Sequence, residues 1–327
     1  PTTRANGSAA EIKREYCAII SAQQQEDPIG SAPNHRRYLL VEVPTPWEAN
    51  AEDSRHFPAG LSEVLRHCAE QSGKFRFLAF DSDAHRSPAG TVRVFYFHAP
   101  PPPAAFFEKQ EYVVPSDRLN ALVEAILTNS KALSDFSGHL QPSAHVRELF
   151  VCTHGTHDAC CAKFGYPIYK HLQDTYGGNA RGNIRVWRTS HFGGHRHAPT
   201  LIDFPEGRYW ARANPEMLAA LIERKGNFAD FARHYRGWGM IGTYAQVAER
   251  EIFSKIGWEW IQYRKEAEIA ESGDESAQVR IRYQTPGGET GVYEAEVYVS
   301  GKVKFGGCGS EWQEAKQYRI RNATAKV

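Results

Sequence analysis

Cysteine and histidine residues gather in one stretch of the chain. Cys152 and Cys161 are separated by eight residues, and His191 and His195 follow with three residues between them. Thiolates and imidazoles are the side chains with which proteins hold zinc ions and some iron–sulfur clusters. In an intracellular chain, clustered cysteines indicate metal or redox chemistry rather than disulfide bonds. We therefore expect the function to reside in this stretch.

The spacing of these residues favours one metal group over another. Zinc fingers and ribbons usually place paired cysteines two to four residues apart, so the interval of eight favours a [2Fe–2S] cluster, which is wider. A structural zinc protein that uses the same four residues remains an alternative. A thiol–disulfide oxidoreductase that uses the vicinal pair Cys160-Cys161 is a weaker one, because the chain contains no C-x-x-C motif. Isolated cysteine and histidine residues are otherwise ordinary core or surface residues.

Two predicted strands deliver these residues to one place. The apolar run Glu148–Val151 predicts a strand that ends at Cys152, and Ile184–Thr189 predicts another that leads into the loop with both histidines. If the two strands are neighbours in a sheet, their loops emerge at the same edge. The pair Gly193-Gly194 argues against a helix between the histidines, since two glycines would cost a helix about 2 kcal/mol.

The remaining elements predict an α/β fold with two similar halves. Each half contains a strand, a helix, further strands and another helix, which favours two thioredoxin-like units with mixed sheets flanked by helices, although many α/β chains can be read in this way. A long helix is predicted over Tyr244–Tyr263, a linker over Ser130–Ser143, and a small antiparallel β appendage beyond them. The predicted domains are an N-terminal unit without cluster ligands, a cluster-binding unit and a β-rich extension, over residues 1–140, 141–268 and 269–327.

Composition limits the classes of partner. Among 327 residues, 39 are basic and 38 acidic, for a net charge of +1, so no bulk attraction to nucleic acid or to a membrane surface is expected. No apolar run approaches the roughly 18 residues of a spanning helix. The polar start, Pro1 to Glu15, carries both charge signs and is unlike a signal or transit peptide, so we expect a cytoplasmic protein. Whether the chain forms a homodimer is left open.

The motifs around these residues are similar to those of a known family. The chain resembles the sucrase/ferredoxin-like proteins, whose C-terminal unit is a thioredoxin-like [2Fe–2S] ferredoxin, over about residues 12 to 225. The matching segments are Cys152-Thr153-His154-Gly155, Asp158, Cys160-Cys161, Gly165, Pro167, Ser190-His191-Phe192-Gly193-Gly194-His195-Arg196, Ala198-Pro199, Pro205-Glu206-Gly207 and Trp210, with Cys17, Ser21, Gly30-Ser31-Ala32-Pro33 and Pro46-Trp47 before them.

The resemblance implies a ligand set of the bis-histidinyl type. In this reading Cys152 and Cys161 hold one iron of the [2Fe–2S] cluster, and His191 and His195 hold the other. Cys160 is the alternative to Cys161, which we favour because it follows Asp158 in the family's D-x-x-C pattern. His154 and His157 lie in the same loop and are the nearest substitutes for either histidine. No paired-carboxylate signature of glycoside hydrolysis accompanies these residues.

The ligand set also indicates what such a cluster would do. Two ferric ions, two sulfides, two thiolates and two neutral imidazoles are neutral together, whereas a four-thiolate cluster carries two negative charges. We therefore expect a reduction potential above the roughly −400 mV of plant-type ferredoxins, toward the about −150 to +300 mV of Rieske centres. Loss of a histidine ring proton would couple electron transfer to proton transfer at alkaline pH. The prediction is an electron-transfer or redox-sensing protein with an unidentified redox partner protein, rather than a stand-alone enzyme.

Overall fold

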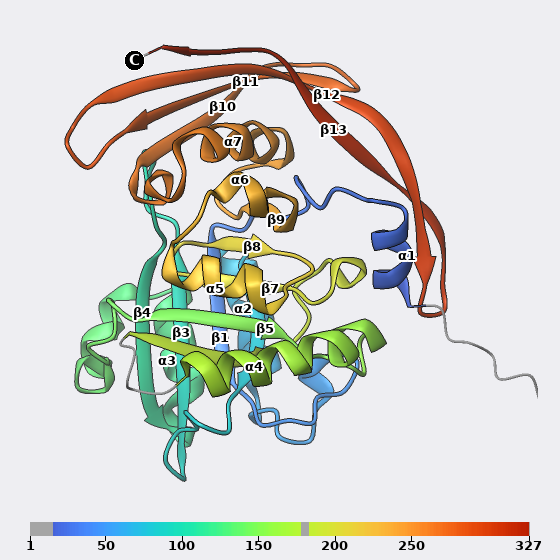
Figure 1. The fold of residues 1–327 in the computed structure, drawn as a ribbon. Coiled ribbons are helices and arrows are strands. Elements are labelled where there is room, and N and C mark those ends of the chain that lie inside the picture. The colour runs from blue at the N-terminus through green and yellow to red at the C-terminus, as the bar shows by residue number, and fades with distance from the viewer. Residues whose placement is uncertain (1–15, 178–182, 327) are drawn as a thin grey trace, which may run out of the picture.

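The structure is a computed structural model that describes residues 16–177 and 183–326. The first half of the chain forms a short helix, four strands and two longer helices (Figure 1). These elements are α1 (Cys17–Gln23), β1 (Arg37–Glu42), α2 (Leu61–Ser72), β2 (Arg76–Asp81), β3 (Thr91–His98), β4 (Glu108–Pro115) and α3 (Leu119–Leu127). The prediction for Pro1 to Glu15 lies outside the described residues.

The second half repeats this order and continues into a separate sheet. Its elements are β5 (Arg147–Cys152), α4 (Tyr166–Tyr176), β6 (Ile184–Thr189), β7 (Leu201–Phe204), β8 (Arg208–Trp210), α5 (Pro215–Glu223), α6 (Phe228–Phe231), β9 (Tyr235–Trp238), α7 (Thr243–Ile256), β10 (Arg264–Ser272), β11 (Ser276–Gln284), β12 (Thr290–Gly307) and β13 (Ser310–Lys326). The start of α5 follows a pattern read from the sequence, because the Asn214 side chain accepts a hydrogen bond from the Met217 amide and Pro215 is the first residue.

The strands of both halves belong to one nine-stranded sheet, in the order β4-β3-β1-β2-β6-β5-β7-β8-β9. In each half a helix links two parallel neighbours, β1 with β2 and β5 with β6, and the next strands are added antiparallel beside the first of the pair. The halves join where β2 and β6 pair antiparallel at Phe80–Thr189 and Asp81–Arg188. The predicted α/β class, with a mixed sheet flanked by helices and an antiparallel appendage, is confirmed, and the two halves share a single sheet.

An aromatic core fills the space between the two halves. Phe95 and Phe97 from β3 lie against Phe150 from β5 and Phe204 from β7, and all four are fully buried. The rings of Phe97 and Phe204 stack with their centroids 4.1 Å apart. The helices α2 and α3 cover the outer face of the first half, whereas α4, α5 and α7 cover that of the second. The loop that follows Cys152 therefore starts from a core to which both halves contribute side chains.

The C-terminal sheet packs on α7 and then reaches beyond it. Its order is β10-β11-β12-β13, with antiparallel neighbours throughout. Alternate residues such as Ile281 and Val297 are buried against Ile252 and Phe253 of α7, as the period of two in a strand requires. The hairpin of β12 and β13 then arches past α7, and its tip lies beside α1 (Figure 1). The appendage is thus longer than the small sheet that we predicted.

Two further predictions differ from the structure. The helix predicted over Tyr244–Tyr263 is interrupted, because Gly257 adopts φ +84° after α7 and a 3₁₀ turn follows. The predicted linker Ser130–Ser143 is largely a 3₁₀ helix that is packed on the first half, where Phe136 is buried. The domain boundaries at residues 140 and 268 stay predictions. Within the described ranges, every helix is too short or too polar to cross a membrane.

Candidate metal centre

The end of β5 and the start of α4 position the two predicted cysteine ligands. Cys152 is the last residue of β5, and Cys161 begins a single π-helical turn that runs directly into α4. The two segments touch at Gly165, where a Cβ atom would lie 2.0 Å from the carbonyl oxygen of Cys152. A residue without a side chain is therefore required for this approach, which brings both cysteines to one place. Cys152 and Cys161 are each only 1% exposed.

The loop after β6 carries the two histidines to the same edge of the sheet. Its first residue, Ser190, is held to β2 by two hydrogen bonds, from its own amide to Ala79 O at 2.8 Å and from the Ala79 amide to its Oγ at 3.0 Å. Gly193 and Gly194 adopt φ +94° and +83°, a region that side chains disfavour. The expected loop, rather than a helix, thus separates His191 from His195. The predicted meeting of the two loops at one edge agrees with the parallel pairing of β5 and β6.

Three of the four predicted ligands converge. The Nδ1 atom of His191 lies 3.6 Å from Cys161 Sγ and 3.9 Å from Cys152 Sγ. The three ligand atoms all lie within 4.8 Å of one another. These side chains can bind one metal group together.

His195 lies next to this trio but faces another partner. Its ring centroid is 5.7 Å from that of His191. Its Nδ1 atom is 2.9 Å from a carboxylate oxygen of Asp158 and 3.1 Å from Cys17 Sγ. Since Asp158 engages Nδ1, Nε2 is the nitrogen with which His195 would bind a metal. The carboxylate fixes the tautomer and ring orientation, as carboxylates do for many metal-binding histidines.

The two buried thiols differ in how readily each loses its proton. Burial alone would raise the pKa of Cys152, but hydrogen bonds from Cys161 and His191 hold that pKa well below its usual value. The hydrogen bond to Cys152, together with burial, raises the pKa of Cys161. The pair therefore already favours one thiolate, which is the form of cysteine that binds metals. A metal ion would complete the deprotonation of the second thiol.

His154 and His157 take supporting positions. His154 accepts a hydrogen bond from the His191 amide at Nδ1 and donates from Nε2 to Glu48 O, at 3.1 and 2.6 Å. His157 stacks on His191 with centroids 4.1 Å apart and donates from Nδ1 to Ala49 O. Burial lowers the pKa of both imidazoles, so both are disposed to be neutral. His154 therefore holds the backbone of His191, and the stacked ring of His157 lies against its imidazole.

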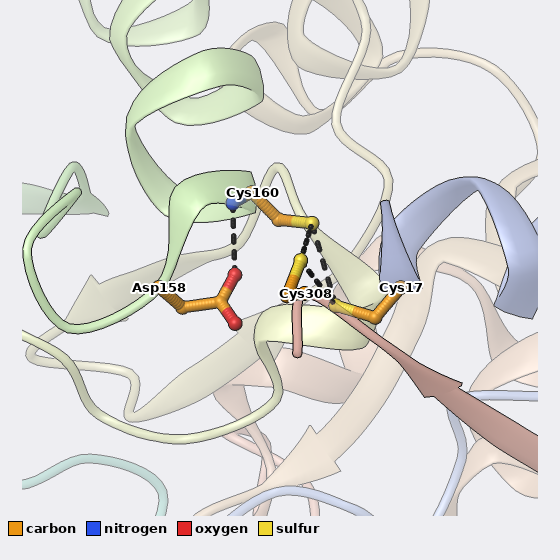
Figure 2. Close-up of side chains that lie close together, drawn as sticks. All are labelled: Cys17, Asp158, Cys160 and Cys308. Atoms are coloured by element: carbon orange, nitrogen blue, oxygen red, sulfur yellow. Dashed lines mark hydrogen bonds between the residues drawn. The ribbon is translucent and has the colours of Figure 1, made fainter. Parts of the chain in front are cut away.

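Cys160 belongs to a different group of side chains. Its sulfur lies 3.3 Å from Cys17 Sγ and 3.3 Å from Cys308 Sγ (Figure 2). The sequence pattern alone did not place Cys17 or Cys308 beside Cys160. No local spacing could have grouped them, because their positions along the chain differ from that of Cys160 by 143 and 148 residues. The sulfur atoms of Cys160 and Cys161 thus face separate groups.

The group of Cys152, Cys161 and His191 comes close to the surface on its histidine side. His157 and His191 line a hollow of about 340 Å³ together with Asn50 and Arg76. The guanidinium of Arg76 donates a hydrogen bond to the His191 carbonyl at 2.6 Å. The imidazole of His191 therefore connects the buried sulfur atoms with a surface that another molecule can approach.

Comparison with known proteins places this site within a described family. The sequence model of the family described as sucrase/ferredoxin-like matches residues 28–237, a range that includes Cys152, Cys161, His191 and His195. Cys17 and Cys308 lie outside the matched range. No curated protein and no solved structure matches the chain significantly.

Proposed function

Because the chain belongs to the sucrase/ferredoxin-like family, we propose that it transfers single electrons through a [2Fe–2S] cluster held by Cys152, Cys161, His191 and His195. The observation that carries the proposal is the convergence of Cys152, Cys161 and His191 at the ends of β5 and β6, with His195 alongside. Two thiols come from one loop and two imidazoles from the other, so each loop can supply one iron with its pair of ligands. This donor set is the one that Rieske-type clusters use.

The surrounding residues suit this role. When bound, the cluster supplies a centre that accepts and releases one electron at a time. Cys152 and Cys161 are each 1% exposed, so water is excluded from the side of the site where their sulfur atoms lie. His154 orients His191 through the backbone amide, and Asp158 orients His195 by accepting the proton on Nδ1. Hydrogen bonds of this kind set the affinity and potential of metal groups.

Electrons would enter or leave through the histidine side of the site. The imidazoles of His157 and His191 line the hollow of about 340 Å³ described above, so they are the groups nearest to a docked molecule. We propose a redox partner protein, as yet unidentified, as the occupant of this surface. A cytoplasmic location remains a prediction.

A mononuclear zinc site is the second candidate, and one observation favours it. Around a single tetrahedral zinc ion, with Zn–S of about 2.3 Å and Zn–N of about 2.05 Å, a sulfur and a nitrogen lie about 3.6 Å apart. The distances from His191 Nδ1 to the two sulfur atoms, 3.6 and 3.9 Å, are close to this value. His195 would complete the set after its ring turned inward.

Metal analysis separates the two candidates. The purified protein should be red-brown, with about two iron atoms and two acid-labile sulfides per chain, which follows from a [2Fe–2S] group. Cys152→Ser and Cys161→Ser should each lose the iron and the visible absorption. Cys68→Ser is the matched control, since Cys68 is fully buried on α2, away from both groups. A colourless protein with zinc in place of iron would contradict the electron-transfer proposal and support the second candidate.

A further inference from the structure

Three cysteines from distant parts of the chain meet at one point. Cys17 is the first residue of α1, Cys160 precedes the turn into α4, and Cys308 sits at the tip of the β12–β13 hairpin. Their sulfur atoms are 3.3, 3.3 and 3.7 Å apart, and all three are free thiols (Figure 2). A disulfide bond would place two sulfur atoms about 2.05 Å apart. The contacts are therefore those of three converging but unbonded thiols.

A carboxylate completes the group. One oxygen of Asp158 and the three sulfur atoms all lie within 4.8 Å of one another. Both oxygens of this carboxylate are also held in place, because Oδ1 accepts a hydrogen bond from the Cys160 amide at 2.8 Å and Oδ2 lies 2.9 Å from His195 Nδ1. Cys17 and Cys160 are nearly fully buried and Cys308 is partly exposed. The set is thus closed on the protein side and accessible from the hairpin tip.

The hairpin tip holds Cys308 in an unusual backbone conformation. Gly307, Cys308 and Gly309 have φ values of +99°, +53° and +84°. Glycine adopts such values readily, whereas a residue with a side chain does so rarely. A cysteine at the centre of this turn, with its sulfur facing two others, indicates that the thiol itself is required there.

We propose that Cys17, Cys160, Cys308 and Asp158 form a zinc site, separate from the group of Cys152, Cys161 and His191. Around a tetrahedral zinc ion with Zn–S bonds of about 2.3 Å, the sulfur atoms lie about 3.8 Å apart, so the observed trio needs to open by only a few tenths of an ångström. Three thiols release their protons to solvent when zinc binds, and no electron is transferred. Two positive charges then face four negative ligands, the same balance as in a zinc site of four cysteines.

The site would fasten α1 and the tip of the β12–β13 hairpin to the loop that carries Cys161. Beyond α7 the hairpin is partly exposed towards its tip, where the guanidinium of Arg196 lies over the ring of Phe305 at 4.2 Å from its centroid. The binding energy of a structural metal contributes directly to the stability of the segments that it joins. Because Asp158 also accepts the Nδ1 proton of His195, zinc would further fix that imidazole. None of the four zinc ligands belongs to the proposed cluster set, so the inference does not depend on the proposed function.

Zinc content of purified variants tests this site. The full chain is supplied with Zn²⁺, freed of loosely bound metal, and analysed for zinc, iron and sulfide per chain. We expect about one zinc per chain in the unmodified protein, in Cys68→Ser and in Cys152→Ser. Cys308→Ser and Cys17→Ser should retain less than a tenth of that amount. Cys308 lies on a partly exposed turn, so Cys308→Ser should fold and keep its iron.

Amide exchange at the hairpin tip provides a second readout. Removal of zinc by a chelator should accelerate exchange over residues 302–309 by tenfold or more in the unmodified protein, and should change little in Cys308→Ser. The inference is overturned if Cys308→Ser holds as much zinc as Cys68→Ser, or if zinc is lost only in Cys152→Ser. Detection of a disulfide between any two of Cys17, Cys160 and Cys308 in the purified protein would also overturn it. Absence of iron in every variant would count against the cluster alone.

Discussion

Replacing Gly165 by alanine should have two opposing effects on the stability of the protein. Gly165 lies in a helical turn with φ −76° and ψ −41°, a conformation that alanine adopts readily. Helix propensity alone would therefore make Gly165→Ala stabilising by about 1 kcal/mol. The added Cβ, however, would lie 2.0 Å from the carbonyl oxygen of Cys152 and 3.2 Å from its carbonyl carbon.

The clash should outweigh the gain in propensity. Non-bonded heavy atoms settle at about 3.5–4.0 Å, so the turn before α4 and the end of β5 would have to separate by more than 1 Å. Overpacking of this kind costs about 1–3 kcal/mol, and the upper value applies here because the obstacle is backbone, which cannot rotate aside. The expected net change is a loss of about 2 kcal/mol in the free energy of unfolding, or roughly a 30-fold change in the unfolding equilibrium. The distance between Cys152 and Cys161 should grow, with loss of metal.

Urea unfolding followed by tryptophan fluorescence measures this change, with iron content determined on the same samples. Gly138→Ala is the matched control, because a Cβ at Gly138 meets no atom within 4 Å. We expect Gly138→Ala to stay within about 0.5 kcal/mol of the unmodified protein. If Gly165→Ala unfolds at the same urea concentration as Gly138→Ala and retains its metal, the close approach of these segments does not position the site.

Three further substitutions probe the aromatic core between the halves, the buried Glu111 carboxylate and the hydrogen bond that supports His195. Phe97→Ala removes a stacked ring between the two halves and should lower the free energy of unfolding by about 3–5 kcal/mol, measured by urea unfolding. Burial would raise the pKa of Glu111, but a hydrogen bond from Arg185 lowers that pKa below the usual 4.5. The ionised Glu111 carboxylate therefore stabilises the fold above pH 4.5, and this stabilisation is lost as the pH falls through the lowered pKa. Glu111→Gln should accordingly lose less stability than the unmodified protein between about pH 6 and about pH 3. Asp158→Asn removes the anionic acceptor of the His195 proton. This substitution should weaken the retention of iron about 10–100-fold in chelator competition.

The strands beside the site and the meeting of the two loops could be predicted from the sequence. The apolar runs that end at Cys152 and Thr189 are strands, and parallel neighbours present their carboxyl ends at one edge. The glycine pair before His195 also indicated a loop, and the backbone adopts the left-handed conformations that glycine permits. These features depend on residues close together in the chain, where propensity and periodicity carry information.

Features that depend on distant contacts could not be read in this way. The pairing of β2 with β6 involves only Phe80–Thr189 and Asp81–Arg188, and no pattern in either strand specifies the other. The meeting of Cys17, Cys160 and Cys308 likewise depends on where α1 and the hairpin tip are carried by the packing of the C-terminal sheet on α7. Gly257 interrupted a helix whose apolar spacing continues beyond it, because a single backbone conformation overrides periodicity there.

The ligand assignment of the cluster is tested most directly by electron paramagnetic resonance of the reduced protein, compared with His191→Cys and His195→Cys. If both imidazoles are ligands, the reduced protein gives the signal of a one-electron-reduced [2Fe–2S] group. Each substitution should then change the spectrum and lower the midpoint potential toward the roughly −400 mV of four-cysteine ferredoxins, because a neutral ligand becomes a thiolate. An unchanged spectrum and potential in both variants, or no signal and no iron in the unmodified protein, would contradict the assignment of Cys152, Cys161, His191 and His195 as the ligands of a redox cluster.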